Sequence, residues 1–373
     1  MEMTMTSRPD GQRTTLNQIC HSSARNSVPA PIHLAMSGPD APSNVIEENE
    51  DFYEGLAQIL YTRNSEEVLE IEVLPPGLGG SLLQDGSAVG INKKALAQAF
   101  LTARQIYFDK CHRMSDSQLI ETIEHDARDS VASEVILLFD CEFITACNWR
   151  KRRIRALVKR DGLNSGFVSA LLQREMSLLT TYVCSPLHRH TKSPTLWQHR
   201  LWTVRMQLDS AVDHGKMLVD EFNVVLRAAE LHPSNYYAFS YMRQLHADVM
   251  ARGCNADVED VLIQKMLSWC LAHPTDVSGW AFLFHLLDCP QPSGAAVVAQ
   301  QRRHVMDRVI DFAVHVAAWQ GESLWTFVDM MIDRFGADIL PGQLAGSLVH
   351  KRETAKSTPP RWKTIMQTIR DTG

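Results

Sequence analysis

The sequence predicts an all-α protein, an α-solenoid of about five helical hairpins. Three observations lead to this fold class. Apolar residues recur at helical spacing through residues 133–335, and a large aromatic residue returns there roughly every 45 residues. Two units are also entered by similar tripeptides, Leu231-His232-Pro233 and Ala272-His273-Pro274, in which proline ends one helix before the next begins. Paired helices at this period stack, because each hairpin exposes an apolar face that only its neighbour can cover.

Residues 1–43 are predicted to be a disordered tail. They are rich in Ser, Thr, Pro and Asn, so they cannot bury enough apolar surface to offset the entropy of ordering. No apolar run approaches the roughly 20 residues that span a bilayer, and the N-terminus lacks the apolar segment of a secretory signal. We therefore expect no membrane span and a cytoplasmic location.

Residues 44–132 are predicted to be an irregular region with helices and a Gly-rich loop. A first helix is expected to start near Asn44 or Asn49. Leu69–Leu74 alternates apolar and acidic residues, as in a short strand or extended arm. Pro75–Gly90 is interpreted as a flexible insertion, because its glycine cluster is not followed by the Lys-Ser/Thr of a phosphate-binding loop.

Residues 133–335 contain the repeat, and each unit places an aromatic anchor in its first helix. The anchors are Trp149, Trp197, Phe239, Trp280 and Trp325. A second amphipathic helix follows each of the first four, with Leu218, Phe222 and Val225 on one face in the second unit. Aromatic residues at repeat spacing usually pack in the core, so we expect the anchors to be buried. Residues 336–373 are expected to form a capping helix and a tail.

The stretch Lys192–Trp202, KSPTLWQHRLW, is the clearest unit. Ser193 can cap the free backbone N–H groups of a helix, and Pro194 fits the first helical position, where its missing N–H costs nothing. Trp197 and Arg200 fall on neighbouring turns. The interpretation is a helix that packs on its apolar side and reaches outward with its charge.

Composition argues against several classes of function. The net charge of -6 gives no bulk reason to bind nucleic acid, so the basic run Arg150–Arg160 is interpreted as an exposed helix face or a surface for an acidic partner. The eight cysteines are scattered without a CxxC, which is typical of reduced, buried thiols. His188, His190 and His199 lack a Cys or carboxylate that would complete a zinc site, so no metal is predicted in this chain.

The unit sequences resemble the protein prenyltransferase alpha-subunit repeat, which usually has the pattern Pro-x-Asn-Tyr-x-x-Trp-x-x-Arg. The resemblance covers about residues 133–335. Five correctly spaced copies carry it: CNWRKRRIRAL, KSPTLWQHRLW, HPSNYYAFSYMRQL, HPTDVSGWAFLFHLL and ESLWTFVDMMI. The first two copies and the long N-terminal region look most like the branch of alpha-subunit repeat-containing proteins.

The resemblance implies an alpha-type subunit, inactive alone, of a heterodimeric enzyme that transfers a geranylgeranyl or farnesyl group to a cysteine of a substrate protein. Its partner would be a beta subunit, an α/α barrel that holds the zinc and the isoprenoid diphosphate, so no cofactor is expected in this chain. By the family pattern, Lys192 and Tyr236 approach the diphosphate as catalytic residues and stabilise its growing negative charge. The residues expected to face the diphosphate or the partner are Asn235, Tyr237, His199 and Arg200.

Three positions depart from the family pattern. Pro194 replaces the tyrosine of the second repeat, Phe239 the tryptophan of the third, and Leu283 the arginine of the fourth. These departures favour an alternative in which the chain is a helical-repeat adaptor that binds proteins and does no chemistry. In that case Lys192 would be a solvated loop lysine and Tyr236 would pack between hairpins.

Overall fold

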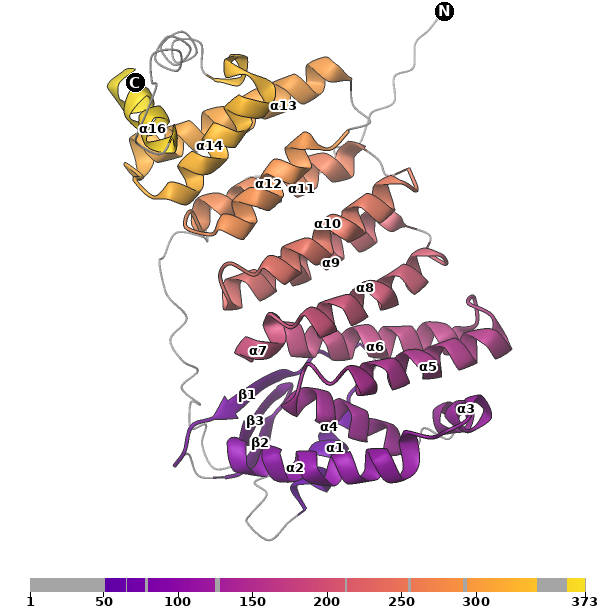
Figure 1. The fold of residues 1–373 in the computed structure, drawn as a ribbon. Coiled ribbons are helices and arrows are strands. Elements are labelled where there is room, and N and C mark those ends of the chain that lie inside the picture. Colours follow the sequence, from indigo (N-terminus) through magenta and orange to yellow (C-terminus); the bar gives the residue numbers. More distant parts are fainter. Residues whose placement is uncertain are drawn as a thin grey trace, which may run out of the picture. The chain divides into compact units, whose positions relative to one another are not determined.

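The structure, a computed structural model, describes residues 51–64, 66–77, 80–124, 128–211, 213–253, 256–290, 294–340 and 361–372. Within this part of the chain the fold is all-α apart from one small sheet, as predicted, and the helices form a solenoid (Figure 1). The predicted tail 1–43 and the predicted helix starts at Asn44 and Asn49 lie outside the described residues. The described part contains no helix that is both long and apolar enough to cross a membrane.

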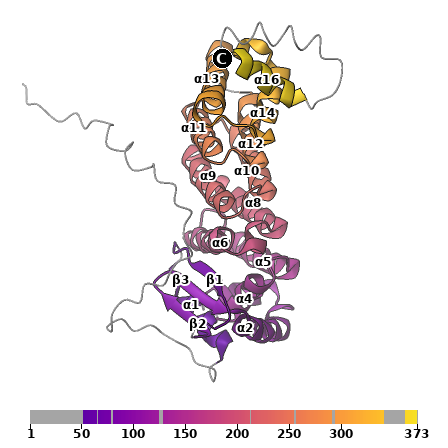
Figure 2. The ribbon, with the colours of Figure 1, turned by 90° about the vertical axis from the view of Figure 1, so that its left-hand side faces the viewer.

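The array consists of paired helices, and Figure 2 shows the two members of each of the first four pairs in two neighbouring rows. The first helix of each unit packs on the first helix of the next, and the second helices of the first three units do the same. The pairs are α5 (Ile144–Asp161) with α6 (Gly166–Cys184), α8 (Pro194–Leu208) with α9 (His214–Leu231), α10 (Tyr236–Met250) with α11 (Ala256–Ala272), α12 (Val277–Asp288) with α13 (Ala295–Asp311), and α14 (Glu322–Phe335) with α16 (Arg361–Thr372).

Side-chain caps start three of the first helices, always four residues before the anchor. Ser193 Oγ accepts from the N–H of Leu196 at 3.1 Å, and Asn235 Oδ1 accepts from the N–H of Ala238 at 3.2 Å. The Oδ1 atom of Asp276 does the same for α12 at 2.8 Å. Each cap satisfies a backbone donor that the helix itself leaves free.

The same three caps also join one unit to the one before it. Ser193 Oγ donates to the carbonyl of Cys141 at 3.3 Å, and Asn235 Nδ2 donates to the carbonyl of Thr191 at 2.8 Å. Asp276 Oδ2 accepts from the backbone N–H of Ser234 at 2.6 Å. One polar side chain per unit therefore sets both the start of a helix and its register on its neighbour.

All five predicted anchors are buried, each at most 2% exposed. Three of them also use the indole N–H in the same way. Trp197, Trp280 and Trp325 each donate to the backbone carbonyl six residues earlier, at 2.8, 3.0 and 2.9 Å. The repeat therefore pairs an aromatic core contact with a fixed backbone hydrogen bond at the start of the helix.

The region before the array is built from helices and a sheet. The helices are α1 (Phe52–Thr62), α2 (Lys93–Ile106), which continues as a π-helix over Tyr107–Cys111, α3 (Asp116–Glu124) and α4 (Val131–Phe139). The strands are β1 (Glu70–Leu74), β2 (Leu82–Asp85) and β3 (Ala88–Asn92), in the order β1-β3-β2. Strand β1 contacts α6, where Ile71 N–H donates to Ser185 Oγ at 2.9 Å.

The strand expected at Leu69–Leu74 is confirmed as β1, but the interpretation of Pro75–Gly90 as a flexible insertion was wrong for residues 82–90. Strands β2 and β3 pair antiparallel across the two-residue turn Gly86–Ser87, and β3 also pairs parallel with β1. Gly86 has φ +57°, which glycine adopts without a steric penalty. Val89 and Ile91 of β3 are buried, so burial of these side chains holds the segment in place.

Candidate functional site

Lys192 lies between the short helix α7 (His188–Thr191) and α8, and it is half-buried. Its Nζ donates to the carbonyl oxygen of Pro233 at 3.0 Å, in the loop before α10. Pro233 stands six residues before Phe239. In the units anchored by tryptophan, the backbone carbonyl at this position accepts a hydrogen bond from the indole N–H. Since phenylalanine has no N–H, Lys192 of the preceding unit supplies this donor.

Tyr236 and Tyr237 open α10 and face solvent, with 63% and 42% of their surface exposed. Their rings meet edge to face, with centroids 5.5 Å apart. Lys192 reaches the loop that leads directly into these tyrosines, so the structure places Lys192 and Tyr236 on one edge of the array.

Two histidines extend this edge. His188 is exposed, and its ring lies 4.7 Å from that of His232, which is half-buried. Burial lowers the pKa of His232, and the neighbouring His188 and Lys192 lower it further. We call the surface formed by His188, Lys192, His232, Tyr236 and Tyr237 the basic–tyrosine edge.

The basic–tyrosine edge has the chemistry of an anion-binding surface. It combines a lysine ammonium, two imidazoles and two phenol O–H groups with the N-terminal end of α10, where backbone dipoles favour negative charge. Such donors can stabilise charge that develops on a departing phosphate group. The edge offers hydrogen-bond donors and positive charge. The nucleophile of a reaction at this edge would have to come from another molecule.

The structure corrects the expectation that His199 and Arg200 face a partner, because both are at most 1% exposed. His199 Nε2 lies 2.6 Å from Glu175 Oε1 on α6. Arg200 forms a bidentate pair with Glu221 of α9, at 2.6 Å from Nε and 2.8 Å from Nη2. The charge of Arg200 thus points into the hairpin, since a carboxylate of the second helix is there to pair with it.

Asn235 is also buried, with no exposed surface, so it does not face a partner. Both ends of its amide are used inside the array, by the cap on α10 and by the bond to Thr191. Among the six residues expected to act at the diphosphate or the partner, the structure leaves Lys192, Tyr236 and Tyr237 accessible. Whether these three act in catalysis stays a prediction.

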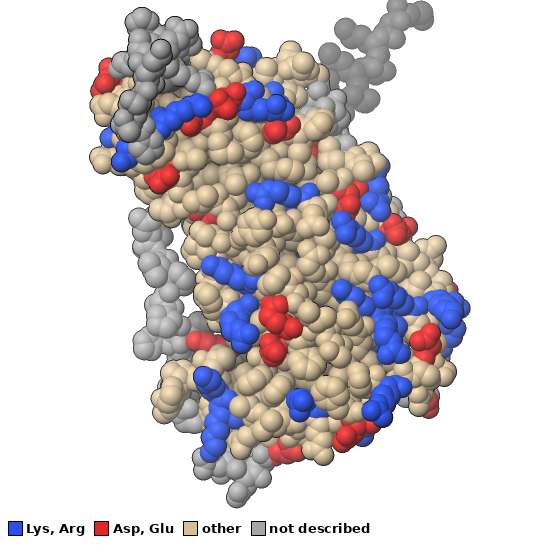
Figure 3. Space-filling view, viewed as in Figure 1, with Lys and Arg blue, Asp and Glu red and all other residues tan. Residues whose placement is uncertain are grey.

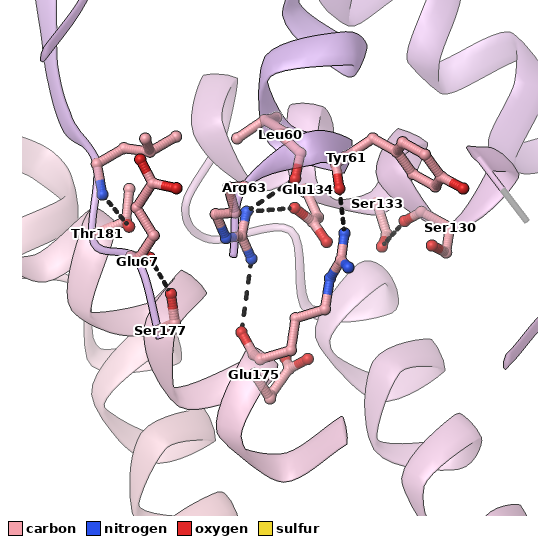
Figure 4. Close-up of polar contacts among 12 residues, drawn as sticks. Leu60, Tyr61, Arg63, Glu67, Ser130, Ser133, Glu134, Glu175, Ser177 and Thr181 are labelled. Carbon is pink, nitrogen blue, oxygen red and sulfur yellow. Dashed lines mark hydrogen bonds and ion pairs between the residues drawn. The ribbon is translucent and has the colours of Figure 1, made fainter. Parts of the chain in front are cut away.

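A buried ionic network joins the first hairpin to the N-terminal helices. Arg63, after α1, donates to Glu134 of α4 at 2.9 Å and reaches the backbone of α6 (Figure 4). Arg150 of α5 pairs with Glu175 at 2.6 Å from Nη2 and with Glu134 at 3.5 Å. Burial would raise the pKa of Glu134, but Arg63 and Arg150 hold it below its usual value.

Arg150 and Arg153 therefore contradict the expectation that the basic run Arg150–Arg160 forms one exposed face. Both are buried, and the guanidinium of Arg153 lies over the Trp149 ring at 5.0 Å. The exposed members are Arg152, Arg155, Lys159 and Arg160. Figure 3 shows basic side chains gathered over the far end of α5 and its neighbours.

Sequence reasoning missed a second polar cluster, between the third and fourth units. His246 of α10, His285 of α12 and Cys289 just after α12 bring one ring nitrogen each and a sulfur within 4.8 Å of one another. Glu259 of α11 contacts His246, with Oε1 2.6 Å from Nε2. Burial would lower the pKa of His246, but Cys289 and Glu259 raise it to about 9. The spacing His285-x-x-x-Cys289, one helical turn, was the signal available in the sequence.

Two comparisons with known proteins bear on this arrangement. Residues 196–310, from α8 to α13, match the model of the ECM9 middle domain. The chain is also similar to protein prenyltransferase alpha subunit repeat-containing protein 1 of Danio rerio, with 28% identity over 172 residues. The matched part covers 42% of this chain and 36% of the zebrafish protein's length. Both matches fall short of the whole chain, and the second is a similarity to a protein named for the repeat that the unit sequences resemble.

Proposed function

We propose that this chain is the alpha-type subunit of a protein prenyltransferase. In this proposal a beta subunit holds the zinc and the isoprenoid diphosphate, and the pair transfers a geranylgeranyl or farnesyl group to a cysteine of a substrate protein. The basic–tyrosine edge faces the diphosphate end of the beta subunit's pocket. The observation that carries the proposal is that Lys192 and Tyr236, far apart in sequence, lie on one accessible edge.

The chemistry of the transfer explains what this edge would contribute. When the substrate thiolate attacks the isoprenoid carbon, the bond to the diphosphate breaks and negative charge grows on the leaving group. Lys192 Nζ and Tyr236 O–H would donate to the diphosphate oxygens, an interaction that strengthens as the charge develops. The similarity to the zebrafish repeat protein supports an alpha-type repeat in this chain.

Co-expression with a Rab-type geranylgeranyltransferase beta subunit tests the subunit role. The expected result is a stable heterodimer that transfers a labelled isoprenoid to a substrate protein, whereas either chain alone does not. Failure to form a complex with geranylgeranyl- or farnesyl-type beta subunits would sink the proposal.

Matched variants of the complex test the residues. Tyr236→Phe removes one exposed hydroxyl and is expected to lower turnover about 100-fold, as loss of one donor to developing charge does elsewhere. Tyr61→Phe, at a half-buried tyrosine of α1 outside the basic–tyrosine edge, is the control. Lys192→Ala should also lower turnover, with Arg189→Ala as the control for loss of a nearby positive charge. If the complex forms and both test variants turn over normally, the assignment of these residues fails while the subunit role survives.

A second candidate function, a helical-repeat adaptor without chemistry, is favoured by the contact between Lys192 and Pro233. That contact gives the ammonium a structural task within the array. Gel filtration separates the two functions, because an adaptor would remain monomeric in the presence of every prenyltransferase beta subunit.

A further inference from the structure

In the cluster of His246, Glu259, His285 and Cys289, two buried polar atoms that could bind a metal make no hydrogen bond within the described residues. His246 is 1% exposed, and its Nδ1, with Cys289 nearby, makes no hydrogen bond of ordinary geometry within the described residues. Glu259 is 2% exposed, and its Oε2 has no hydrogen bond within the same residues. A buried polar atom without a partner costs about 1–3 kcal/mol, so two of them in contacting side chains call for an explanation.

The geometry around these atoms suits a metal ion. Cys289 Sγ lies 3.6 Å from His285 Nε2 and 3.8 Å from Nδ1, both close to the separation of two ligands on a tetrahedral ion with bonds of roughly 2.0–2.3 Å. The ligand atoms of the three residues span at most 4.8 Å, so the widest pair would close by roughly 1 Å on binding. The centroids of the His246 and His285 rings are 5.4 Å apart, and the two rings meet edge to face.

We propose that His246, His285 and Cys289 bind a Zn²⁺ ion. Glu259 accepts the N–H on the far side of the His246 ring and orients it, leaving Nδ1 to coordinate the metal. Water, or Glu259 after a small shift, completes four ligands. Binding releases two protons to solvent, one from the Cys289 thiol, which becomes a thiolate, and one from Nδ1 of the protonated His246 ring.

The donor set and its surroundings decide the identity of the ion. One thiolate and two imidazoles with a carboxylate beside them are typical of Zn²⁺, whereas Mg²⁺ and Ca²⁺ prefer oxygen ligands. The thiolate and the Glu259 carboxylate together balance the charge of a divalent ion. The positive charge of Arg243 opposes the binding of a cation, and the negative charge of Asp288 favours it.

The accessibility of the ligands provides a path for the ion. His285 and Cys289 are half-buried at the end of α12, and His246 lies behind them in the core. A bound ion would join α10 of the third unit to α12 of the fourth. It would thus stabilise the array whether or not the chain acts in prenyl transfer.

Cobalt titration of the full-length chain tests the proposal, because Co²⁺ replaces Zn²⁺ in such sites and reports a thiolate ligand by its charge-transfer absorption. The chelator-treated chain is expected to bind one Co²⁺, with charge-transfer and tetrahedral d–d bands that Zn²⁺ abolishes. Cys289→Ser should lose the charge-transfer band, and His285→Gln should weaken binding at least tenfold. Cys184→Ser, a half-buried thiol on another helix, is the control and should bind as the wild type does.

The outcomes divide cleanly. Absence of a thiolate–cobalt band in the wild type, or its persistence in Cys289→Ser, would overturn the proposal. Because His285 and Cys289 are half-buried, both variants should fold, and unfolding temperature without metal verifies this. Zn²⁺ should raise that temperature for the wild type and for Cys184→Ser, and leave it unchanged for Cys289→Ser.

Discussion

Lys192 Nζ and the carbonyl oxygen of Pro233 lie 3.0 Å apart and join the second unit of the array to the third. In the units anchored by Trp197, Trp280 and Trp325, the indole N–H donates a hydrogen bond to the equivalent carbonyl oxygen. The third unit has Phe239 in place of a tryptophan, and a lysine from the neighbouring unit donates to the carbonyl instead. Lys192, which was expected to act at a diphosphate, therefore also supplies the hydrogen bond that Phe239 cannot make.

This compensation predicts that residues 192 and 239 are energetically coupled. Lys192→Met keeps the aliphatic stem and removes the donor, which should cost about 0.5 kcal/mol because the bond is partly exposed. Phe239→Trp should cost about 1–3 kcal/mol by overpacking a full core. In the double variant the indole can reach Pro233, so the combined loss should be smaller than the sum. Urea unfolding of the four proteins measures the coupling, and strict additivity would refute it.

The dual role of the caps predicts an unequal cost of removing them. Asn235→Ala deletes both the cap of α10 and the bond to Thr191 from a fully buried position, so it should destabilise the chain by about 2 kcal/mol. Asp213→Ala removes an exposed cap of α9 that makes no bond across units, and should cost about 1 kcal/mol. Equal losses in chemical unfolding would show that the bond to Thr191 contributes nothing.

The parts of the fold that follow from local pattern were predictable. The capping by Ser193 and the burial of the anchors depend on spacing within one or two helices, and both are confirmed. The hairpin β2–β3 was missed although Gly86-Ser87 is a two-residue turn signal, because only pairing with the distant β1 and burial of Ile91 make its strands stable.

The buried charges were beyond sequence reasoning for a different reason. Arg150 looks like a member of an exposed basic run until Glu134 and Glu175, from two other helices, are placed beside it. Arg200 is likewise buried only because Glu221 of the next helix meets it. A long cation is read as exposed by default, and its partner becomes visible only when the helices are packed.

The network around Glu175 predicts a large loss on neutralising that residue. Glu175→Gln keeps the shape but removes the nearer of the two carboxylates that pair with buried Arg150 and the carboxylate that pairs with buried His199, so it should destabilise by about 3–5 kcal/mol. Asp220→Asn, in an exposed pair with Lys216, is the control and should leave the unfolding temperature unchanged. A small effect of Glu175→Gln would show that water or rearrangement replaces the pair.

Two buried histidines and two buried glutamates predict that the chain loses stability in acid in two stages. His190 and His199 have lowered pKa values, mainly through burial, so they bind protons less readily when folded. Their contribution is therefore present above the unfolded pKa of about 6.5 and declines as the pH falls below it. Glu134 and Glu175 have pKa values lowered by their arginine partners, against the effect of burial. Their contribution is present above about pH 4.3 and is lost as the pH falls further.

Unfolding temperature measured from pH 7.5 to pH 3.5 should therefore fall gently below about pH 6.5 and steeply below about pH 4.5. His190→Gln, which can still donate to the carbonyl of Leu137, should flatten the first stage and leave the second. Glu175→Gln should flatten the second stage, because one of the two coupled carboxylates no longer takes up a proton. A wild-type profile that is level from pH 6.5 to pH 3.5 would contradict the assignment of these buried charges.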